Sequence, residues 1–363
     1  MGRMDQAIAT GISFHKKVVP VAMPYYNYDK IYSLNAQYNF IISNRGLGKT
    51  YGISRKVVQK AIDTGEQFVL LRRWKTELTT KDSFFDALIA KGEFPTWDFR
   101  VRGLYGEMSP KSAANDKKRA WQRIGYFIAL SQGQHFKGKP FPLVKTIIFD
   151  EFIVENGSMQ YIKGEVDAFN NFYSTIDRQT DKTKVFFLAN SISIINPYFL
   201  HYKIQPQGEE WIKAQKSKIT NLPFWVVHFP KAEDFKQRVH ETRFGEFIEG
   251  TDYDKYATEN QFADNHTAML GEKPSHMEYN FTLETNEGIV TVWSWGGKYF
   301  VQEKRPKHEK IFTNNPYSMD ETKYLIENNS KFMQILRTAY RNNRMKFDKQ
   351  VTRNIFIQIF IRN

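Results

Sequence analysis

Short apolar runs that alternate with longer segments of helical periodicity dominate the first two thirds of the chain. Residues 38–43 predict a buried strand, a glycine-containing loop follows at once, and apolar positions then recur at helical spacing from Ile53 to Ile62 before Gly65. Further apolar strands are predicted at 67–71, 146–149, 185–188 and 224–227. Strands that alternate with helices indicate an α/β fold, with a parallel sheet covered by helices on both faces.

Two regions depart from this pattern. The alternating runs 97–105 and 123–131 flank a polar stretch and predict a hairpin beside the sheet. After Pro230 the chain becomes polar and charged, which indicates a linker or small helical subdomain. Three alternating runs then predict an antiparallel meander at 279–283, 289–293 and 299–302.

Helical segments are expected from Asp320 onward. The chain is therefore predicted to have a large α/β domain at 1–230, a linker subdomain at 231–266 and a smaller α+β domain at 267–363.

The loop between the first strand and its helix carries the core of a P-loop, the Walker A motif. Its backbone N–H groups and the helix N-terminus are expected to face the phosphates of ATP or GTP. Lys49 would reach the β- and γ-phosphates, and the Thr50 hydroxyl would hold Mg²⁺. Ser43 stands where the motif usually has its first glycine. The predicted nucleotide-binding residues here are Asn44, Arg45, Gly46, Leu47, Gly48, Lys49 and Thr50.

A second signature, Walker B, is the apolar strand 146–149 followed by Asp150 and Glu151. An acid at the carboxyl end of a buried strand can hold the Mg²⁺ shell, which suits Asp150. Glu151 is placed to polarise the attacking water. Paired acids are common in loops, so this pair is assigned to Walker B only because a P-loop lies upstream. The second acid indicates a hydrolase rather than a kinase or a G protein.

The spacing of the two signatures narrows the class. About a hundred residues separate Lys49 from Asp150, which leaves room for an intervening strand and its helices. This is typical of P-loop proteins of the ASCE class, which have an inserted strand and a catalytic glutamate and include helicases, AAA+ proteins and packaging motors. Asn190, at the end of the next strand, would sit beside the γ-phosphate as a sensor. Its alternative role is a polar cap at the strand end.

Charge and composition bound the partners. The net charge of +13 favours a polyanionic partner, with a basic protein that binds no nucleic acid as the alternative. Between Lys331 and Asn363, eight Lys and Arg face one acid, and Ile335, Leu336, Ala339 and Tyr340 predict one helix face. That helix either docks on its own domain or forms a partner site. The absence of cysteine excludes disulfides and thiolate metal sites, and the lack of a long apolar run predicts no membrane partner.

Several basic residues could complete the site of a neighbouring subunit. Ring ATPases use an arginine of this kind to stabilise transition-state charge. A solvated surface role is the alternative for each of them. The candidates are Arg72, Arg73, Lys75, Lys137, Lys139 and Arg178.

The sequence as a whole resembles the DNA-packaging ATPases of small phi-29-type podophages, which are terminase-like genome-packaging motors. The resemblance spans residues 30 to 355. It is carried by the P-loop and by the runs 65–68, 71–78, 148–152, 196–199, 242–245 and 260–262.

The resemblance implies a homopentameric ring that uses ATP and Mg²⁺ to draw double-stranded DNA into a procapsid. It would work in the host cell cytoplasm, transiently at the portal vertex. The C-terminal domain would contact the portal, or connector, and a packaging RNA. That domain would have a vestigial RNase H-like nuclease fold that does not cut DNA. In agreement, residues 277–303, where a metal-binding aspartate would be expected, contain no Asp.

The resemblance also suggests roles for single residues. The trans-acting arginine of the family precedes the sensor strand, and Arg178 matches it. Lys75 and Lys137 match basic residues at the subunit boundary. The DNA-facing loop of the family follows the Walker B acids, so the DNA-binding candidates here are Asn156, Ser158 and Lys163.

Three functions stay open on the sequence alone. The first is an ATP-driven double-stranded DNA translocase for genome packaging. The second is a terminase-like ATPase with an active endonuclease domain, for which Glu278 or Glu284 would have to supply acid ligands. The third is a nucleotide-dependent scaffold with negligible turnover.

Overall fold

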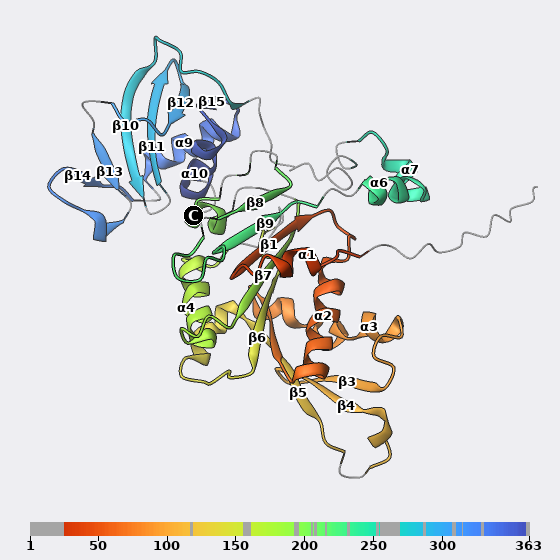
Figure 1. Ribbon diagram of the computed structural model, residues 1–363. Helices are drawn as coiled ribbons and strands as arrows, with labels where there is room; N and C mark the ends of the chain where they lie inside the picture. Colours follow the sequence, from red (N-terminus) through yellow and green to blue (C-terminus); the bar gives the residue numbers. More distant parts are fainter. Residues whose placement is uncertain are drawn as a thin grey trace, which may run out of the picture.

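The computed structural model contains two β-sheets joined by a pair of short helices (Figure 1). It describes residues 25–116, 119–154, 161–191, 196–204, 206, 209–214, 216–230, 233–251, 254, 269–285, 288–306, 310–313, 315–327 and 330–360. Within these ranges, every helix is too short or too polar to span a bilayer.

The first sheet has nine strands in the described part of the chain, in the order β3-β4-β5-β2-β6-β7-β1-β9-β8. Strands β5, β2, β6, β7, β1 and β9 are parallel to one another, while β3, β4 and β8 are antiparallel additions at the edges. The bounds are β1 Tyr38–Ser43, β2 Gln67–Arg72, β3 Trp97–Arg102, β4 Tyr105–Pro110, β5 Gln122–Ala129, β6 Val144–Asp150, β7 Lys184–Asn190, β8 Trp211–Lys213 and β9 Trp225–His228.

Strand β7 lies between β1, which leads into the P-loop, and β6, which ends in the Walker B acid. Strands β2 to β5 fill the interval between the two motifs in the sequence, as their spacing predicted, and β7 is the strand inserted between β1 and β6 in the sheet. It also brings the carboxyl ends of β2, β6, β7 and β1 to the same edge of the sheet, where ligands bind in open α/β folds.

Helices cover both faces, as predicted, because successive side chains of each buried strand point to opposite sides. Phe40 and Ile42 pack on one side with α4 (Glu165–Asp177) and α5 (Pro197–His201). Ile41 packs on the other side with α1 (Asp29–Ser33), α2 (Lys49–Thr64) and α3 (Asp86–Ala90).

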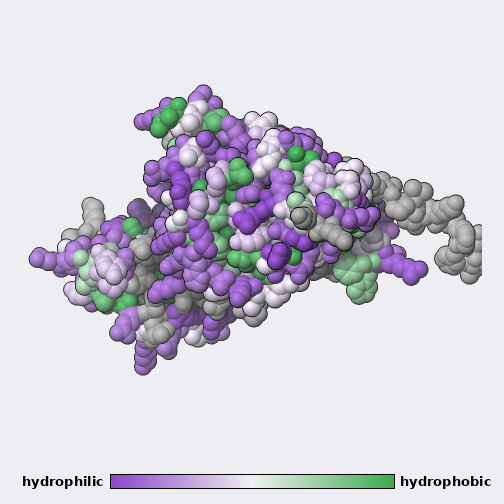
Figure 2. Space-filling model, turned by 90° about the horizontal axis from the view of Figure 1, so that it is seen from below, coloured by the Kyte–Doolittle hydropathy of each residue, from purple (hydrophilic) through white to green (hydrophobic). Residues whose placement is uncertain are grey.

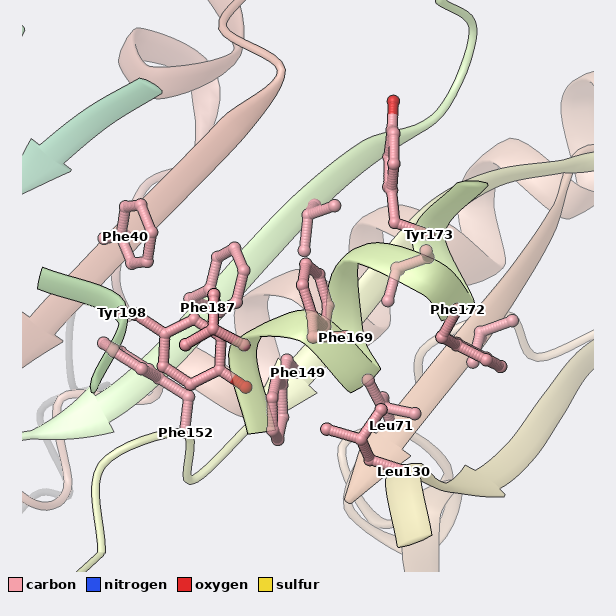
Figure 3. Packing of buried hydrophobic residues seen from close by; sticks show 14 of the residues in the cluster. Phe40, Leu71, Leu130, Phe149, Phe152, Phe169, Phe172, Tyr173, Phe187 and Tyr198 are labelled. Carbon is pink, nitrogen blue, oxygen red and sulfur yellow. The ribbon is translucent and has the colours of Figure 1, made fainter. Parts of the chain in front are cut away.

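The first of these layers is rich in aromatic side chains (Figure 3). The rings of Phe40 and Phe187 stack with centroids 4.3 Å apart, and Phe149 stacks on Phe169 of α4 at 5.8 Å. Rigid rings packed in this way fix the position of α4 relative to β6 and β7.

The predicted hairpin was wrong in its partners. Strand β3 pairs with β4, which begins at Tyr105, the last residue of the first run, and continues through the stretch that the pattern left between the two runs. Strand β5 instead enters the sheet, antiparallel to β4 and parallel to β2. The sequence of β4, Tyr-Gly-Glu-Met-Ser-Pro, is too polar to signal a strand, and it is held by pairing on both of its edges.

Two short helices follow the first sheet, α6 (Glu233–His240) and α7 (Arg243–Ile248). The Thr242 side chain caps α7 by accepting from the Gly245 N–H at 3.0 Å.

The second sheet has six strands among the described residues, in the order β14-β13-β10-β11-β12-β15. Strands β10 (Glu278–Thr285), β11 (Gly288–Trp295) and β12 (Lys298–Gln302) form the predicted antiparallel meander. Parallel strands flank it, namely β13 (Ile311–Thr313), β14 (Lys323–Leu325) and β15 (Met345–Phe347). The expectation of helices from Asp320 onward was therefore wrong at β14 and β15, which are too short to show a period.

Helices α9 (Lys331–Arg341) and α10 (Gln350–Phe360) pack on this second sheet. Met333, Leu336 and Ala339 are buried in its core, whereas Ile335 is exposed and does not belong to the docked face. Docking on its own sheet is thus the observed arrangement of this basic segment. The face seen from below is mainly hydrophilic, with hydrophobic residues in separate areas (Figure 2).

Candidate nucleotide-hydrolysis site

The P-loop forms a cradle at the N-terminus of α2. Gly46 and Gly48 have φ angles of +91° and +73°, a region that side-chain-bearing residues rarely adopt. Gly48 is the N-cap of this 16-residue helix, whose dipole favours a phosphate at that end.

Lys49 lies buried at the centre of the cradle. Its Nζ donates to the carbonyl and hydroxyl oxygens of Ser43 at 3.1 and 3.0 Å and to the carbonyl of Asn44 at 3.0 Å. Ser43, the departure from the usual motif, therefore supplies two of the acceptors that hold the lysine. Burial lowers the pKa of Lys49 to about 8, against the attraction of Asp150, so a phosphate would supply the negative charge that the cavity lacks.

The sensor candidate reaches the same point from the neighbouring strand. The side-chain oxygen of Asn190, the last residue of β7, accepts from Lys49 Nζ at 3.2 Å. The structure thus brings Asn190 to the place where a γ-phosphate would compete for Lys49.

Thr50 and Asp150 meet at the edge of the cradle. The Thr50 hydroxyl lies 3.3 and 3.4 Å from the two carboxylate oxygens of Asp150. A hydroxyl beside a carboxylate is a donor set that Mg²⁺ accepts in nucleotide sites. The residues present therefore fit the magnesium nucleotide that the P-loop implies.

Arg72, the last residue of β2, bridges the two Walker B acids of its own chain. Its guanidinium lies 2.8 Å from Asp150 Oδ2 and 2.7 Å from Glu151 Oε2. Burial opposes the charge, but the two acids raise the pKa of Arg72 above its usual value. Arg72 was a candidate for acting on a neighbouring subunit, and in this structure its charge is engaged with the two acids of its own site.

Glu151 has an unusual backbone. Its φ is +59°, a strained conformation for a glutamate, and its side chain is 51% exposed. Arg73 stabilises this turn by donating to the carbonyls of Glu151 at 3.2 Å and Phe152 at 2.7 Å. The same guanidinium makes a bidentate pair with Glu165 of α4, at 2.7 and 3.0 Å.

The solvated surface role that was the alternative for Arg73 is therefore wrong, since its side chain is only 2% exposed. Its partner Glu165 lies 92 positions away, and no local pattern in the sequence marks the two as a pair.

An aromatic group beside the P-loop also escaped the sequence patterns. The Tyr26 N–H donates to the carbonyl of Leu47 at 3.0 Å, and its hydroxyl lies 2.6 Å from Nδ1 of His228. Burial lowers the pKa of His228 to about 4, so this imidazole is neutral near pH 7. The ring of Phe235 on α6 lies where a Cβ at Gly46 would be only 3.3 Å away. The segment before β1 and the helix after β9 thus both contact the P-loop.

Two trans-acting candidates lie together at the opposite end of the strands. Arg178, just after α4, is exposed and donates to the carbonyl of Gly138 at 3.4 Å, next to the exposed Lys137. Strand β7 begins at Lys184 and reaches the site at Asn190, which at ~3.3 Å per residue is a distance of roughly 20 Å. Arg178 is therefore far from the nucleotide site of its own chain.

Some of the remaining candidate residues lie within the described part of the chain, and others do not. Lys75 is exposed in a 3-10 turn at Lys75–Leu78, shortly after Arg72, and Lys163 is exposed before α4. Arg45 is exposed in the P-loop. Asn156 and Ser158 lie outside the described residues.

Comparisons with known proteins agree with this geometry. A family model described as podovirus DNA encapsidation protein (Gp16) matches residues 22–363. The DNA packaging protein of Bacillus phage phi29 is 30% identical over 341 residues, which cover 93% of this chain and 97% of that protein.

Solved structures give the same result. A chain of the bacteriophage phi-29 viral genome packaging motor assembly is 28% identical, with a TM-score of 0.68 over 93% of this chain and 98% of that one. The crystal structure of the N-terminal domain of the phi29 DNA packaging ATPase is 30% identical, with a TM-score of 0.50 over 58% of this chain and 98% of that domain. The chain belongs to the family of podovirus DNA encapsidation proteins.

Proposed function

We propose that this chain is an ATP-driven double-stranded DNA translocase that packages a viral genome. The observation that carries the proposal is the convergence of Lys49, Thr50, Asp150 and Glu151 at one edge of the sheet. The similarity to a DNA packaging protein and to a genome packaging motor supports DNA as the substrate that is moved.

In the hydrolysis step, Lys49 binds the β- and γ-phosphates and Asn190 senses the γ-phosphate. Thr50 and Asp150 would hold Mg²⁺, which would neutralise phosphate charge. Glu151 accepts the proton of the attacking water. Its Oε2 is paired with Arg72, which holds the carboxylate in place while the other oxygen accepts the proton.

Arg178 completes the site of a neighbouring subunit together with Lys137 beside it, while Lys75 acts at the subunit boundary from the nucleotide end of its own sheet. Its exposure and its distance from the P-loop of its own chain support this role, because an arginine at that end of β7 can reach a nucleotide only in another copy. Such sharing requires a ring, which we propose to be a homopentamer at the portal vertex of a procapsid in the host cytoplasm.

The chain divides, in our proposal, into the ATPase domain at 1–230, the linker at 231–266 and the C-terminal domain at 267–363. The end of β9 at His228 and the start of β10 at Glu278 support this division. The C-terminal domain would be RNase H-like and would contact the portal and a packaging RNA. Lys163, together with Asn156 and Ser158, would contact DNA through phosphates, since a motor must move over any sequence.

Hydrolysis is tested with Glu151→Gln. We expect the variant to bind ATP normally but to hydrolyse it about 100-fold more slowly or worse, because the general base is lost. Glu303→Gln, which changes an exposed acid paired with Lys349, is the control and should keep wild-type turnover. Hydrolysis by Glu151→Gln near the wild-type rate would overturn the catalytic role.

The trans role is tested by mixing Arg178→Ala with wild-type protein and measuring DNA-stimulated ATPase. Each variant subunit should disable the site of its neighbour, so that activity falls more steeply than the mole fraction of wild type. Arg102→Ala removes another exposed arginine, on β3, and should only dilute the activity. A strictly proportional loss with Arg178→Ala would argue against action in trans.

An active endonuclease is the second candidate, and the geometry of its acids disfavours it. The carboxylate of Glu284 is paired with Arg305 at 2.7 Å and with Lys323 at 3.0 Å, and these contacts, Lys323 foremost, lower its pKa. Both oxygens of Glu284 are thus paired with cations, whereas Oδ1 of Asp150 faces the Thr50 hydroxyl, and a carboxylate engaged on both oxygens is a poor ligand for a catalytic metal. We propose that the chain does not cut DNA, and robust nicking of a plasmid with Mg²⁺ or Mn²⁺ that is lost in Glu284→Gln would refute this.

A further inference from the structure

The turn that follows α4 is held in a strained conformation. Arg178, Gln179 and Asp181 have φ angles of +50°, +60° and +53°, and none of them is a glycine. Left-handed backbone is unfavourable for residues with a Cβ and persists where the surroundings impose it. Three such residues within four positions require a strong local constraint.

The carboxylate of Asp177 supplies that constraint. Its Oδ2 accepts from the N–H groups of Thr180 at 2.9 Å and Asp181 at 3.0 Å. Its Oδ1 accepts from Lys182 at 3.0 Å and Thr183 at 2.9 Å. Asp177 is only 3% exposed, so four charge-assisted bonds in a dry environment gather the backbone of the turn around a single side chain.

The turn is also attached to the sheet. The carbonyl of Thr183 accepts from the Tyr173 hydroxyl at 3.1 Å, and that hydroxyl accepts from Gln37 at 2.7 Å. Arg178, by contrast, is exposed at the C-terminal end of α4 and donates to the carbonyl of Gly138. A turn that is fixed to the sheet thus carries an exposed arginine.

We infer that Asp177 is a positioning residue that aims Arg178 at the site of the neighbouring subunit. The inference rests on the proposed trans role of Arg178. Asp177 touches no nucleotide itself. Its carboxylate holds the backbone N–H groups of residues 180–183, and this fixes the turn that begins at Arg178, the C-cap of α4, so that the arginine arrives already oriented.

Asp177→Asn in the full chain is the central test. The amide keeps one acceptor oxygen but turns an NH₂ group toward two backbone N–H donors, so half of the constraint is lost. Mixed with wild-type protein, this variant should reduce DNA-stimulated ATPase more than in proportion, with a loss of about tenfold or more in pure assemblies. Its ATP affinity should be unchanged, because the site of its own chain is intact. Asp181→Asn, which removes an exposed charge and tolerates left-handed backbone, should behave as wild type.

A second variant separates positioning from folding. Asp177→Asn combined with Gln179→Gly relieves the backbone strain at φ +60°. This double variant should recover the thermal stability that Asp177→Asn loses. Its DNA-stimulated ATPase activity should stay low, because Arg178 is still not oriented toward the neighbouring site. Recovery of both stability and activity would overturn the positioning role.

The mixing experiment distinguishes the two failures. A proportional loss with Asp177→Asn, alongside a steep loss with Arg178→Ala, overturns the inference and leaves the proposed function standing. A proportional loss with Arg178→Ala overturns the trans role and the inference together.

Discussion

The buried ion pair between Arg73 and Glu165 allows a quantitative prediction about stability. Their side chains are 2% and 0% exposed. Glu165 accepts from Nε and Nη2 of Arg73, from the Tyr198 hydroxyl at 3.0 Å and from the Ile162 N–H at 2.8 Å. Glu165→Gln keeps the shape of the side chain but removes the countercharge.

The guanidinium cannot escape by losing its proton. Burial opposes its charge, but Glu165 raises the pKa of Arg73 above an already high value. Breaking a buried pair by removing one partner costs about 3–5 kcal/mol, and we expect about 3 because Arg73 keeps its two carbonyl acceptors. For a domain of about 200 residues this corresponds to a fall of roughly 6–12 °C in Tm.

Urea unfolding of wild type and variant, with the m-value as a check on two-state behaviour, measures the difference. Asp29→Asn is the control, because the Lys56–Asp29 pair is largely exposed and should leave the unfolding free energy unchanged. A Glu165→Gln protein within about 1 kcal/mol of wild type would refute the reasoning, since it would show that the lone charge is accommodated at little cost.

Two further predictions concern the P-loop and its helix. Burial lowers the pKa of Lys49 to about 8, so the unliganded protein loses the ammonium proton of Lys49 as the pH rises through that value. Above this pH the affinity for ATP should fall, and binding of ATP should take up a proton. Calorimetry in buffers of different ionisation enthalpy measures this proton uptake. An affinity that is flat from about pH 7 to 9.5 would contradict this. Gly52→Ala should destabilise by about 1–3 kcal/mol in urea unfolding although alanine favours helices, since its Cβ would lie 2.9 Å from the carbonyl oxygen of Tyr26. Gly133→Ala, whose Cβ would meet Phe172 at an ordinary 3.4 Å, should change little.

The parts of the fold that the sequence predicts are those with a strong local period. Strands β1, β2, β6, β7 and β9 are apolar on both faces, and Gly65 ends α2 in a left-handed conformation at φ +74°. Strand β4 was missed because its polar residues form a strand only through pairing with β3 and β5, which depends on tertiary structure rather than on propensity.

The candidate site divides in the same way. Lys49, Thr50, Asp150 and Asn190 follow strands whose carboxyl ends meet, so their proximity was predictable. The contacts of Arg72 and Arg73 were not, because a guanidinium reaches partners that only the folded chain brings near. The strained turn after Asp177 was equally hard to predict, since its left-handed residues are not glycines.

Strand β7 has a consequence for communication between subunits in the proposed ring. Its last residue, Asn190, touches Lys49, and its first lies six residues after Arg178. The five residues from Val185 to Ala189 are fully buried in a close-packed interior that transmits strain rather than absorbing it. If Arg178 serves the next subunit, one stiff strand joins the phosphate sensor of one site to the arginine of another. Nucleotide binding at one site would then shift the arginine that serves the next site. The order in which the subunits hydrolyse ATP would depend on this one strand.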